Sequence, residues 1–194
     1  SVTEEATLNR VINFIFDNIG QSISINKIAN TLTSHGAKTT NKTVEKYLKL
    51  LEDAFVIYKA ERYDIRGKER LQSLGKYFVI DTGLRNQKLG KTYNDNMGSQ
   101  IENIVYLELK RRGYTVNVGK YNTQEIDFVA RRANEIHYYQ VTKQIPDNQH
   151  ESDNLLHIPD NYQKTIITAN RMDVGNIGGI EVIHVVDFLL NKDK

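Results

Sequence analysis

The chain has 194 residues, of which 39% are hydrophobic and 26% are charged, and its formal net charge is +2. This composition allows a hydrophobic core and is ordinary for a soluble globular protein. The chain has no cysteine, which excludes disulfides and cysteine-based zinc sites. No apolar run approaches the roughly 18 residues that span a membrane, and the first ten residues lack the basic and apolar blocks of a signal peptide. We therefore expect a cytoplasmic protein with no membrane contact.

The N-terminal part of the sequence predicts three helices followed by a β-hairpin. Apolar residues recur at helical spacing over 8–19 and over 25–32. A third helix follows the turn "SHGAKTTN" and buries Val44, Tyr47, Leu48 and Leu51. Two β-rich segments, 54–63 and 76–81, then flank the polar tip "DIRGKER". This order of elements is that of a winged helix-turn-helix domain, which we assign to residues 1–82.

Basic residues in this part of the sequence favour DNA as a partner. Thr40 and Asn41 begin the third helix, at the end that enters the major groove in helix-turn-helix proteins. Residues 1–98 carry 15 Lys/Arg and 11 Asp/Glu, a net charge of +4, whereas residues 99–194 carry 11 and 13, a net charge of −2. The alternative is a winged helix that only packs on other domains. Tyr63 lies between basic residues of the hairpin. The candidate phosphate contacts on the helix and the hairpin are Lys42, Lys46, Lys49, Arg62, Arg66, Lys68 and Arg70.

The C-terminal half predicts a mixed α/β domain over residues 99–194. A polar connector over 83–98, with a short helix at most, precedes a strong helix in "GSQIENIVYLELKRRGY". Three strands joined in a meander, a helix near 149–157, two more strands and a short last helix follow. This order predicts a mixed sheet flanked by helices. The five strands are expected at 115–121, 125–132, 136–143, 164–169 and 180–186, with a turn at Ala133–Asn134.

That order is also the core of restriction-endonuclease-like nucleases. Those enzymes use carboxylates at the end of a sheet to hold one or two Mg²⁺ ions, which activate a water and stabilise the phosphate transition state. Glu102 on the helix and Asp127 on a strand match two such acids. Gln140 stands in the second strand position, thirteen residues after Asp127, where these nucleases carry Glu, and Thr142 stands where they carry Lys. If the site is active, we expect Glu102, Asp127, Gln140 and Lys143 to form it, with Mg²⁺ or Mn²⁺ on Glu102 and Asp127.

Each of these residues also has a purely structural interpretation. Ser99 and Glu102 fit a helix capping box. Asp127 fits the solvent face of an alternating strand, and Gln140 fits a hydrogen-bonding strand residue. Lys143 is one residue away from the lysine position, so on a regular strand it would point to the opposite face.

Several stretches together resemble a known family. They are "RYDIRGKERL", "KYFVIDTGLRNQ", "GSQIENIVYLELKRRGY", "EIDFVA", "YYQVTKQI", "DNYQKTII" and "GIEVIHVVDFLL". They are similar to the C-terminal region, catalogued as domain of unknown function 4143, of prokaryotic AAA-type P-loop ATPases, over about residues 60–192. The resemblance implies a preceding winged helix, a nuclease-like domain and an ATPase domain upstream in the same polypeptide. This chain itself has no Gly-x4-Gly-Lys-[Ser/Thr] phosphate loop.

Three functions follow as expectations. The leading one is a catalytically degenerate module that binds DNA or regulates the ATPase, because both residues of the Glu-x-Lys pair are replaced. The second is an active Mg²⁺- or Mn²⁺-dependent DNA endonuclease. The third is a protein-interaction scaffold that does not contact DNA.

Overall fold

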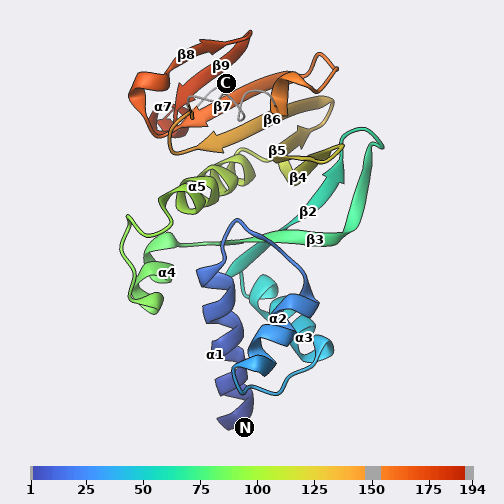
Figure 1. The fold of residues 1–194 in the computed structure, drawn as a ribbon, viewed down its shortest axis with the longest axis vertical. Coiled ribbons are helices and arrows are strands. Elements are labelled where there is room, and N and C mark those ends of the chain that lie inside the picture. Colours follow the sequence, from blue (N-terminus) through green and yellow to red (C-terminus); the bar gives the residue numbers. More distant parts are fainter. Residues whose placement is uncertain (1, 147–153, 191–194) are drawn as a thin grey trace. The chain divides into compact units, whose positions relative to one another are not determined.

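The computed structural model describes residues 2–146 and 154–190, which form two compact units (Figure 1). Unit 1 takes the chain up to Ala60 and then Ser73–Asp95. Unit 2 takes Glu61–Gln72 and the chain from Asn96 onward. The mixed α/β class expected from the sequence is confirmed. No helix in the described part of the chain is both long and apolar enough to cross a membrane.

Unit 1 contains the three helices that the sequence predicted, and two of them begin at capped residues. Ser24 Oγ accepts a hydrogen bond from Lys27 N at 3.1 Å, and Thr40 Oγ1 accepts one from Thr43 N at 3.3 Å. The helices pack around a core that includes Ile15, Ile28, Leu48 and Tyr77. The unit consists of α1 (Val2–Asp17), β1 (Ser22–Ile23), α2 (Ile25–Ser34), α3 (Asn41–Asp53), the bases of two long strands, and α4 (Thr82–Leu89).

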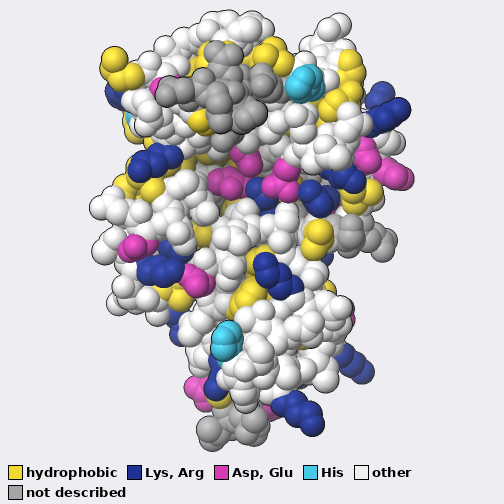
Figure 2. Space-filling view, in the orientation of Figure 1, with side chains coloured by type: hydrophobic (Ala, Val, Ile, Leu, Met, Phe, Trp, Pro, Cys, Tyr) yellow, Lys and Arg dark blue, Asp and Glu magenta, His cyan; other side chains and the backbone are white. Residues whose placement is uncertain are grey.

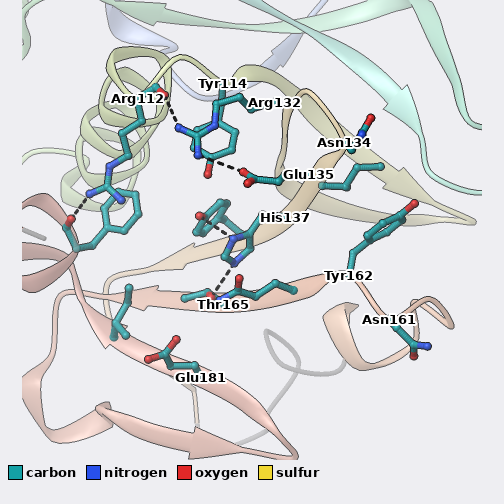
Figure 3. A pocket seen from close by; sticks show the side chains of 15 residues that line it. Arg112, Tyr114, Arg132, Asn134, Glu135, His137, Asn161, Tyr162, Thr165 and Glu181 are labelled. Carbon is teal, nitrogen blue, oxygen red and sulfur yellow. Dashed lines mark hydrogen bonds and ion pairs between the residues drawn. The ribbon is translucent and has the colours of Figure 1, made fainter. Parts of the chain in front are cut away.

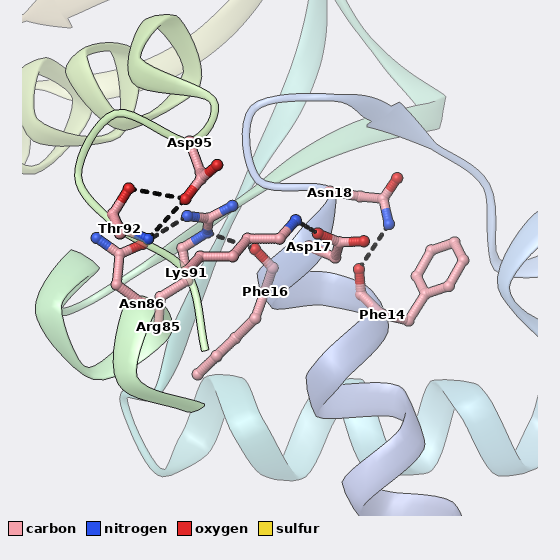
Figure 4. Close-up of polar contacts among 9 residues, drawn as sticks. All are labelled: Phe14, Phe16, Asp17, Asn18, Arg85, Asn86, Lys91, Thr92 and Asp95. Atoms are coloured by element: carbon pink, nitrogen blue, oxygen red, sulfur yellow. Dashed lines mark hydrogen bonds and ion pairs between the residues drawn. The ribbon is translucent and has the colours of Figure 1, made fainter. Parts of the chain in front are cut away.

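The segment expected as a connector is anchored within unit 1 by polar contacts (Figure 4). Arg85 on α4 is fully buried, and its Nε donates to Phe16 O at 2.6 Å while Nη1 donates to Asn86 Oδ1 at 2.7 Å. Lys91 donates to Asp17 on α1. The short helix in this segment is therefore α4, and it packs against α1.

The hairpin of β2 (Ile57–Asp64) and β3 (Glu69–Val79) is divided between the two units. Its base belongs to unit 1, where β3 pairs antiparallel with β1. Its tip, residues 61–72, belongs to unit 2, where Arg62–Asp64 pair in parallel with Val118–Lys120. The sequence had assigned the whole hairpin to one domain.

Unit 2 is a mixed sheet with helices packed on it. The tip of β2 is followed across the sheet by β4, β5, β6, β7, β9 and β8. The pairs β2/β4, β6/β7 and β7/β9 are parallel, and β4/β5, β5/β6 and β8/β9 are antiparallel. Helix α5 contacts β4–β6, and α7 contacts β7 and β9. The elements are α5 (Met97–Arg111), β4 (Thr115–Tyr121), β5 (Gln124–Arg132), β6 (Glu135–Thr142), β7 (Gln163–Thr168), the 3-10 turn η1 (Arg171–Asp173), β8 (Gly175–Ile177), β9 (Ile180–His184) and α7 (Val185–Leu190).

The five strands predicted in this half are confirmed as β4, β5, β6, β7 and β9, and so is the turn at Ala133–Asn134. The short strand β8 was not predicted. Of the helix predicted near 149–157, the structure describes residues 154–156 as helical, and the first part of that prediction lies outside the described residues.

Candidate functional site

A bulge in β5 sets the position of Asp127. In the pairing of β4 with β5, Asn117 faces Val129 but Gly119 faces Ile126, so Asp127 and Phe128 together oppose one residue of β4. A Cβ on Gly119 would lie 2.8 Å from Val129 Cγ2 and 2.9 Å from the Ile126 Cβ. Only glycine therefore allows β4 to approach the bulge this closely.

Asp127 and Gln140 are brought together where β5 and β6 stop pairing. The last paired residues are Phe128 and Tyr139. Just beyond this pair, Val141 N donates to Asp127 Oδ2 at 2.9 Å, and Asp127 N donates to Gln140 Oε1 at 3.4 Å. Both side chains are buried, with 9% and 7% exposure. We call this reciprocal contact the Asp127–Gln140 clamp, because each side chain satisfies a backbone donor on the other strand.

The structure places the other two predicted site residues, Glu102 and Lys143, on α5 and beyond β6. Glu102 lies in the second turn of α5 and is half-buried. Lys143 is exposed beyond the end of β6, and Thr142 Oγ1 donates to Gln144 O at 2.8 Å. Among the residues that the structure describes, no three His, Asp or Glu side chains are grouped so as to hold a metal ion.

The capping box expected at Ser99 is not formed. Helix α5 begins at Met97 and its N-cap is Asn96, so Ser99 already lies inside the helix. Ser99 therefore is not the N-cap residue that the motif requires.

The cations predicted on α3 are exposed. Lys42, Lys46 and Lys49 all lie on the solvent side, opposite the buried Val44 and Leu48. Lys49 forms an ion pair with Asp53 at 2.7 Å, so its charge is partly offset. The two polar residues at the start of the helix have structural partners, since Thr40 is the N-cap and Asn41 Nδ2 donates to Asn26 Oδ1 at 2.8 Å.

The residues of the hairpin tip are divided between exposed and buried positions. Arg66, Lys68 and Arg70 are exposed. Arg62 is half-buried and pairs with Glu125 of β5 at 3.0 Å. Tyr63 is buried in the core of unit 2. The interpretation of Tyr63 as a side chain presented to DNA is therefore wrong, because its ring packs inside unit 2.

Unit 2 also contains a pocket that the sequence did not reveal, with a volume of about 580 Å³ (Figure 3). It lies beside the first half of β6, whereas the Asp127–Gln140 clamp lies beside the second half. His137 and Tyr139 alternate along β6 and so share a face. Thr165 reaches the same face because β7 pairs in parallel with β6 and places Thr165 opposite Tyr139.

Comparison with known proteins gives relatives without a described function. Residues 1–95 match a family described as a domain of unknown function (DUF8612). An uncharacterized protein of Haemophilus influenzae is 53% identical over 189 residues, which are 97% of this chain and 47% of that protein. The uncharacterized protein MJ1544 of Methanocaldococcus jannaschii is 33% identical over 121 residues, which are 60% of this chain and 26% of that protein. The chain thus spans about half, or less, of the length of these curated relatives.

Among solved structures, the crystal structure of protein VC1899 from Vibrio cholerae aligns with a TM-score of 0.30 and 11% sequence identity. The alignment covers 97% of this chain and 54% of that one.

The family match over residues 1–95 ends at Asp95, which is also the last residue of unit 1.

Proposed function

We propose that this chain is a winged-helix and nuclease-like module of an AAA-type ATPase, and that it binds DNA without cleaving it. The element order of unit 1, α1–β1–α2–α3 followed by β2 and β3, supports a winged helix. The mixed sheet of unit 2 with α5 packed on it supports a restriction-endonuclease-like domain. The Haemophilus relative continues for about half its length outside the match, which leaves room for an ATPase domain.

The exposed face of α3 carries the DNA part of the proposal. Lys42 and Lys46 are one turn apart, on the side opposite the core. A hollow of about 260 Å³ at the start of α3 is lined by two lysines, Lys38 and Lys46, by one acid, Glu4, and by threonines of the turn and of α3. Backbone N–H groups and the positive end of the helix dipole both favour an anion at such a position. A DNA phosphate in this hollow would place α3 in the major groove.

The cations of the chain do not form one continuous basic surface on the face seen in Figure 2, where Lys and Arg side chains are scattered among acidic and neutral ones. The proposal therefore depends on a few specific contacts. We assign the first of them to α3 of unit 1, where Lys42 and Lys46 are exposed.

The Asp127–Gln140 clamp supports the absence of cleavage. One oxygen of Asp127 accepts the Val141 N–H, and Gln140 contributes a neutral amide where a nuclease has a second carboxylate. The exposed Lys143 lies past the end of β6. A site that lacks one negative charge and its lysine holds a divalent cation less tightly and stabilises the transition state less.

Reversing two charges on α3 is expected to weaken DNA binding. The double variant Lys42→Glu/Lys46→Glu should bind a DNA duplex at least about tenfold more weakly. The negative slope of log K against log salt should become shallower by about two, because two phosphate contacts are lost. Fluorescence anisotropy of a labelled duplex over a salt series measures both. Lys88→Glu, an exposed lysine on α4, is the matched control and should leave binding unchanged. Equal affinities of the double variant and the parent would remove α3 from the interface, and salt-independent or absent binding would favour the protein scaffold.

Supercoiled plasmid is expected to stay intact when it is incubated with the chain in Mg²⁺ or in Mn²⁺. The reason is that Gln140 is neutral where these nucleases carry a second carboxylate, and that Asp127 Oδ2 already accepts the Val141 N–H. Gel electrophoresis over a range of protein concentrations measures the result, with Asp127→Ala as the paired variant. Nicking by the parent but not by Asp127→Ala would establish the alternative, an active metal-dependent endonuclease.

A further inference from the structure

The pocket of unit 2 has a polar floor built from three linked side chains (Figure 3). Tyr139 Oη lies 3.0 Å from His137 Nδ1, and His137 Nε2 lies 2.9 Å from Thr165 Oγ1. Burial lowers the pKa of His137 to about 4, so its ring is neutral at physiological pH and carries one N–H. The Tyr139 ring stacks on it at a centroid distance of 4.1 Å.

This chain of hydrogen bonds has two directions. When Tyr139 donates to His137 Nδ1, Nε2–H donates to Thr165, and the Thr165 hydroxyl hydrogen is available to a ligand. When Thr165 donates to Nε2, Nδ1–H donates to Tyr139, and the Tyr139 hydroxyl hydrogen is available instead. The floor can therefore adapt its donor to the acceptor pattern of a polar, uncharged ligand group.

Two arginines, Arg112 and Arg132, and two acids, Glu135 and Glu181, line the pocket. Arg132 is the cation that an anion could reach. The Arg132 guanidinium lies 4.7 Å above the centre of the Tyr114 ring and donates to Arg112 O at 3.2 Å. Arg132 Nη2 lies 3.2 Å from Glu135 Oε2, and both side chains are about half exposed. An exposed pair of this kind contributes at most about 1 kcal/mol, so an incoming anion can replace Glu135 at little cost. Arg112 is the more fixed of the two arginines, because its Nε donates to Glu108 at 2.7 Å and its guanidinium stacks on Phe188.

The rim of the pocket carries groups that bind planar heterocycles. Tyr162 is 40% exposed and is held edge-on against Tyr138 at a centroid distance of 6.2 Å. Asn134, Asn161 and Gln163 are exposed amides, each with a donor and an acceptor. An aromatic platform with amides beside it is the combination that stacks on an unpaired base and hydrogen-bonds its edge.

We propose that this pocket binds a nucleoside phosphate, with the phosphate on Arg132 and the base against Tyr162 and the amides of the rim. The site is separate from the Asp127–Gln140 clamp, and it does not depend on DNA binding by α3. The same chemistry is supplied by a free nucleotide and by the 5′-end of a single nucleic-acid strand. A volume of about 580 Å³ lies within the range of pockets that enclose small organic ligands.

The test is to titrate the intact chain separately with 5′-AMP, adenosine and inorganic phosphate. Calorimetry measures the affinity, and the NMR resonances of the His137 ring report binding in the pocket. We expect 5′-AMP to bind at least about tenfold more tightly than adenosine, because a charge-assisted hydrogen bond to phosphate is added. Arg132→Gln should remove that advantage, and Tyr162→Ala should weaken 5′-AMP without changing the response to inorganic phosphate. Arg171→Gln is the matched control, because Arg171 also forms an exposed ion pair, at 3.1 Å from Asp187, and does not line the pocket.

A 5′-phosphorylated single-stranded oligonucleotide distinguishes the two sources. If the oligonucleotide displaces 5′-AMP when its concentration is lower than that of 5′-AMP, the pocket is assigned to a strand end. If it does not displace 5′-AMP, the pocket is assigned to a free nucleotide. The proposal is overturned if adenosine binds as tightly as 5′-AMP, if Arg171→Gln weakens binding as much as Arg132→Gln, or if millimolar 5′-AMP leaves the His137 resonances unmoved.

Discussion

Replacing Ile65 with aspartate is expected to destabilise unit 2 by about 3 kcal/mol or more, because the change puts an unpaired charge into a hydrophobic core. Ile65 is 6% exposed and packs in a cluster with Tyr63, Ile126 and Leu155. Its backbone N–H donates to Lys120 O at 2.9 Å, which extends the pairing of β2 with β4. If the hairpin tip were instead a free DNA-binding wing, a charge at this position would meet water and cost little.

Amide hydrogen exchange measures this effect separately in the two units. In Ile65→Asp, the amides of β4 should lose protection, whereas those of α2 and α3 should keep it, since they belong to unit 1. Arg66→Ala is the matched control because Arg66 is the next residue and is exposed, and it should change the free energy of unfolding by no more than about 0.5 kcal/mol. Unchanged protection of β4 in Ile65→Asp would mean that the tip is not part of the unit 2 core.

The periodicity of the sequence was enough to find most elements. The strands β4 to β6 and the face of α5 carrying Ile101 and Val105 follow from local alternation and from helical spacing. The buried face of α3 was also predicted, since Val44 and Leu48 are one turn apart. These features depend on residues close together in the chain, so a local pattern carries them.

Partners distant in the sequence could not be predicted in this way. Tyr63 and Ile65 alternate with polar residues as a strand requires, but nothing local says that β4, more than fifty residues later, covers them. The pocket could not be predicted for the same reason, because it depends on a contact between distant residues. His137 and Tyr139 share a face by alternation, whereas Thr165 joins them only through the parallel register of β6 and β7.

The bulge at Asp127 and Phe128 lies between these two cases, because it joins two strands but one residue of the sequence indicates it. Gly119 interrupts the β-rich sequence of β4, and a glycine inside a strand often marks a bulge or a close approach of two backbones. The structure places the irregular residues opposite Gly119, at Asp127 and Phe128 of β5. A bulge in β6 that would turn Lys143 toward the site is not observed among its described pairs, which run in regular register from His137 to Thr142 along β7.

Replacing Asp127 with alanine is expected to lower the free energy of unfolding by about 1–3 kcal/mol, because the Val141 N–H loses its acceptor. Asp127→Asn keeps an oxygen acceptor of the same shape, so it should cost clearly less. Denaturant unfolding of the intact chain, with hydrogen exchange at Val141 as the local readout, measures both. Asp187→Ala is the matched control, since Asp187 is 55% exposed and pairs with Arg171 on the surface. It should have almost no effect.

The sign of the Asp127→Ala effect separates the two interpretations of this residue. Catalytic sites commonly hold their charged groups at a cost in stability, so removal of a catalytic acid is often neutral or stabilising. Removal of an acid that satisfies a backbone donor between two strands is destabilising. A stabilised Asp127→Ala protein would therefore contradict the structural role of the Asp127–Gln140 clamp and favour the active nuclease. Destabilisation by Asp127→Ala, with Asp127→Asn close to the parent, would support Asp127 as a residue that holds β5 and β6 together.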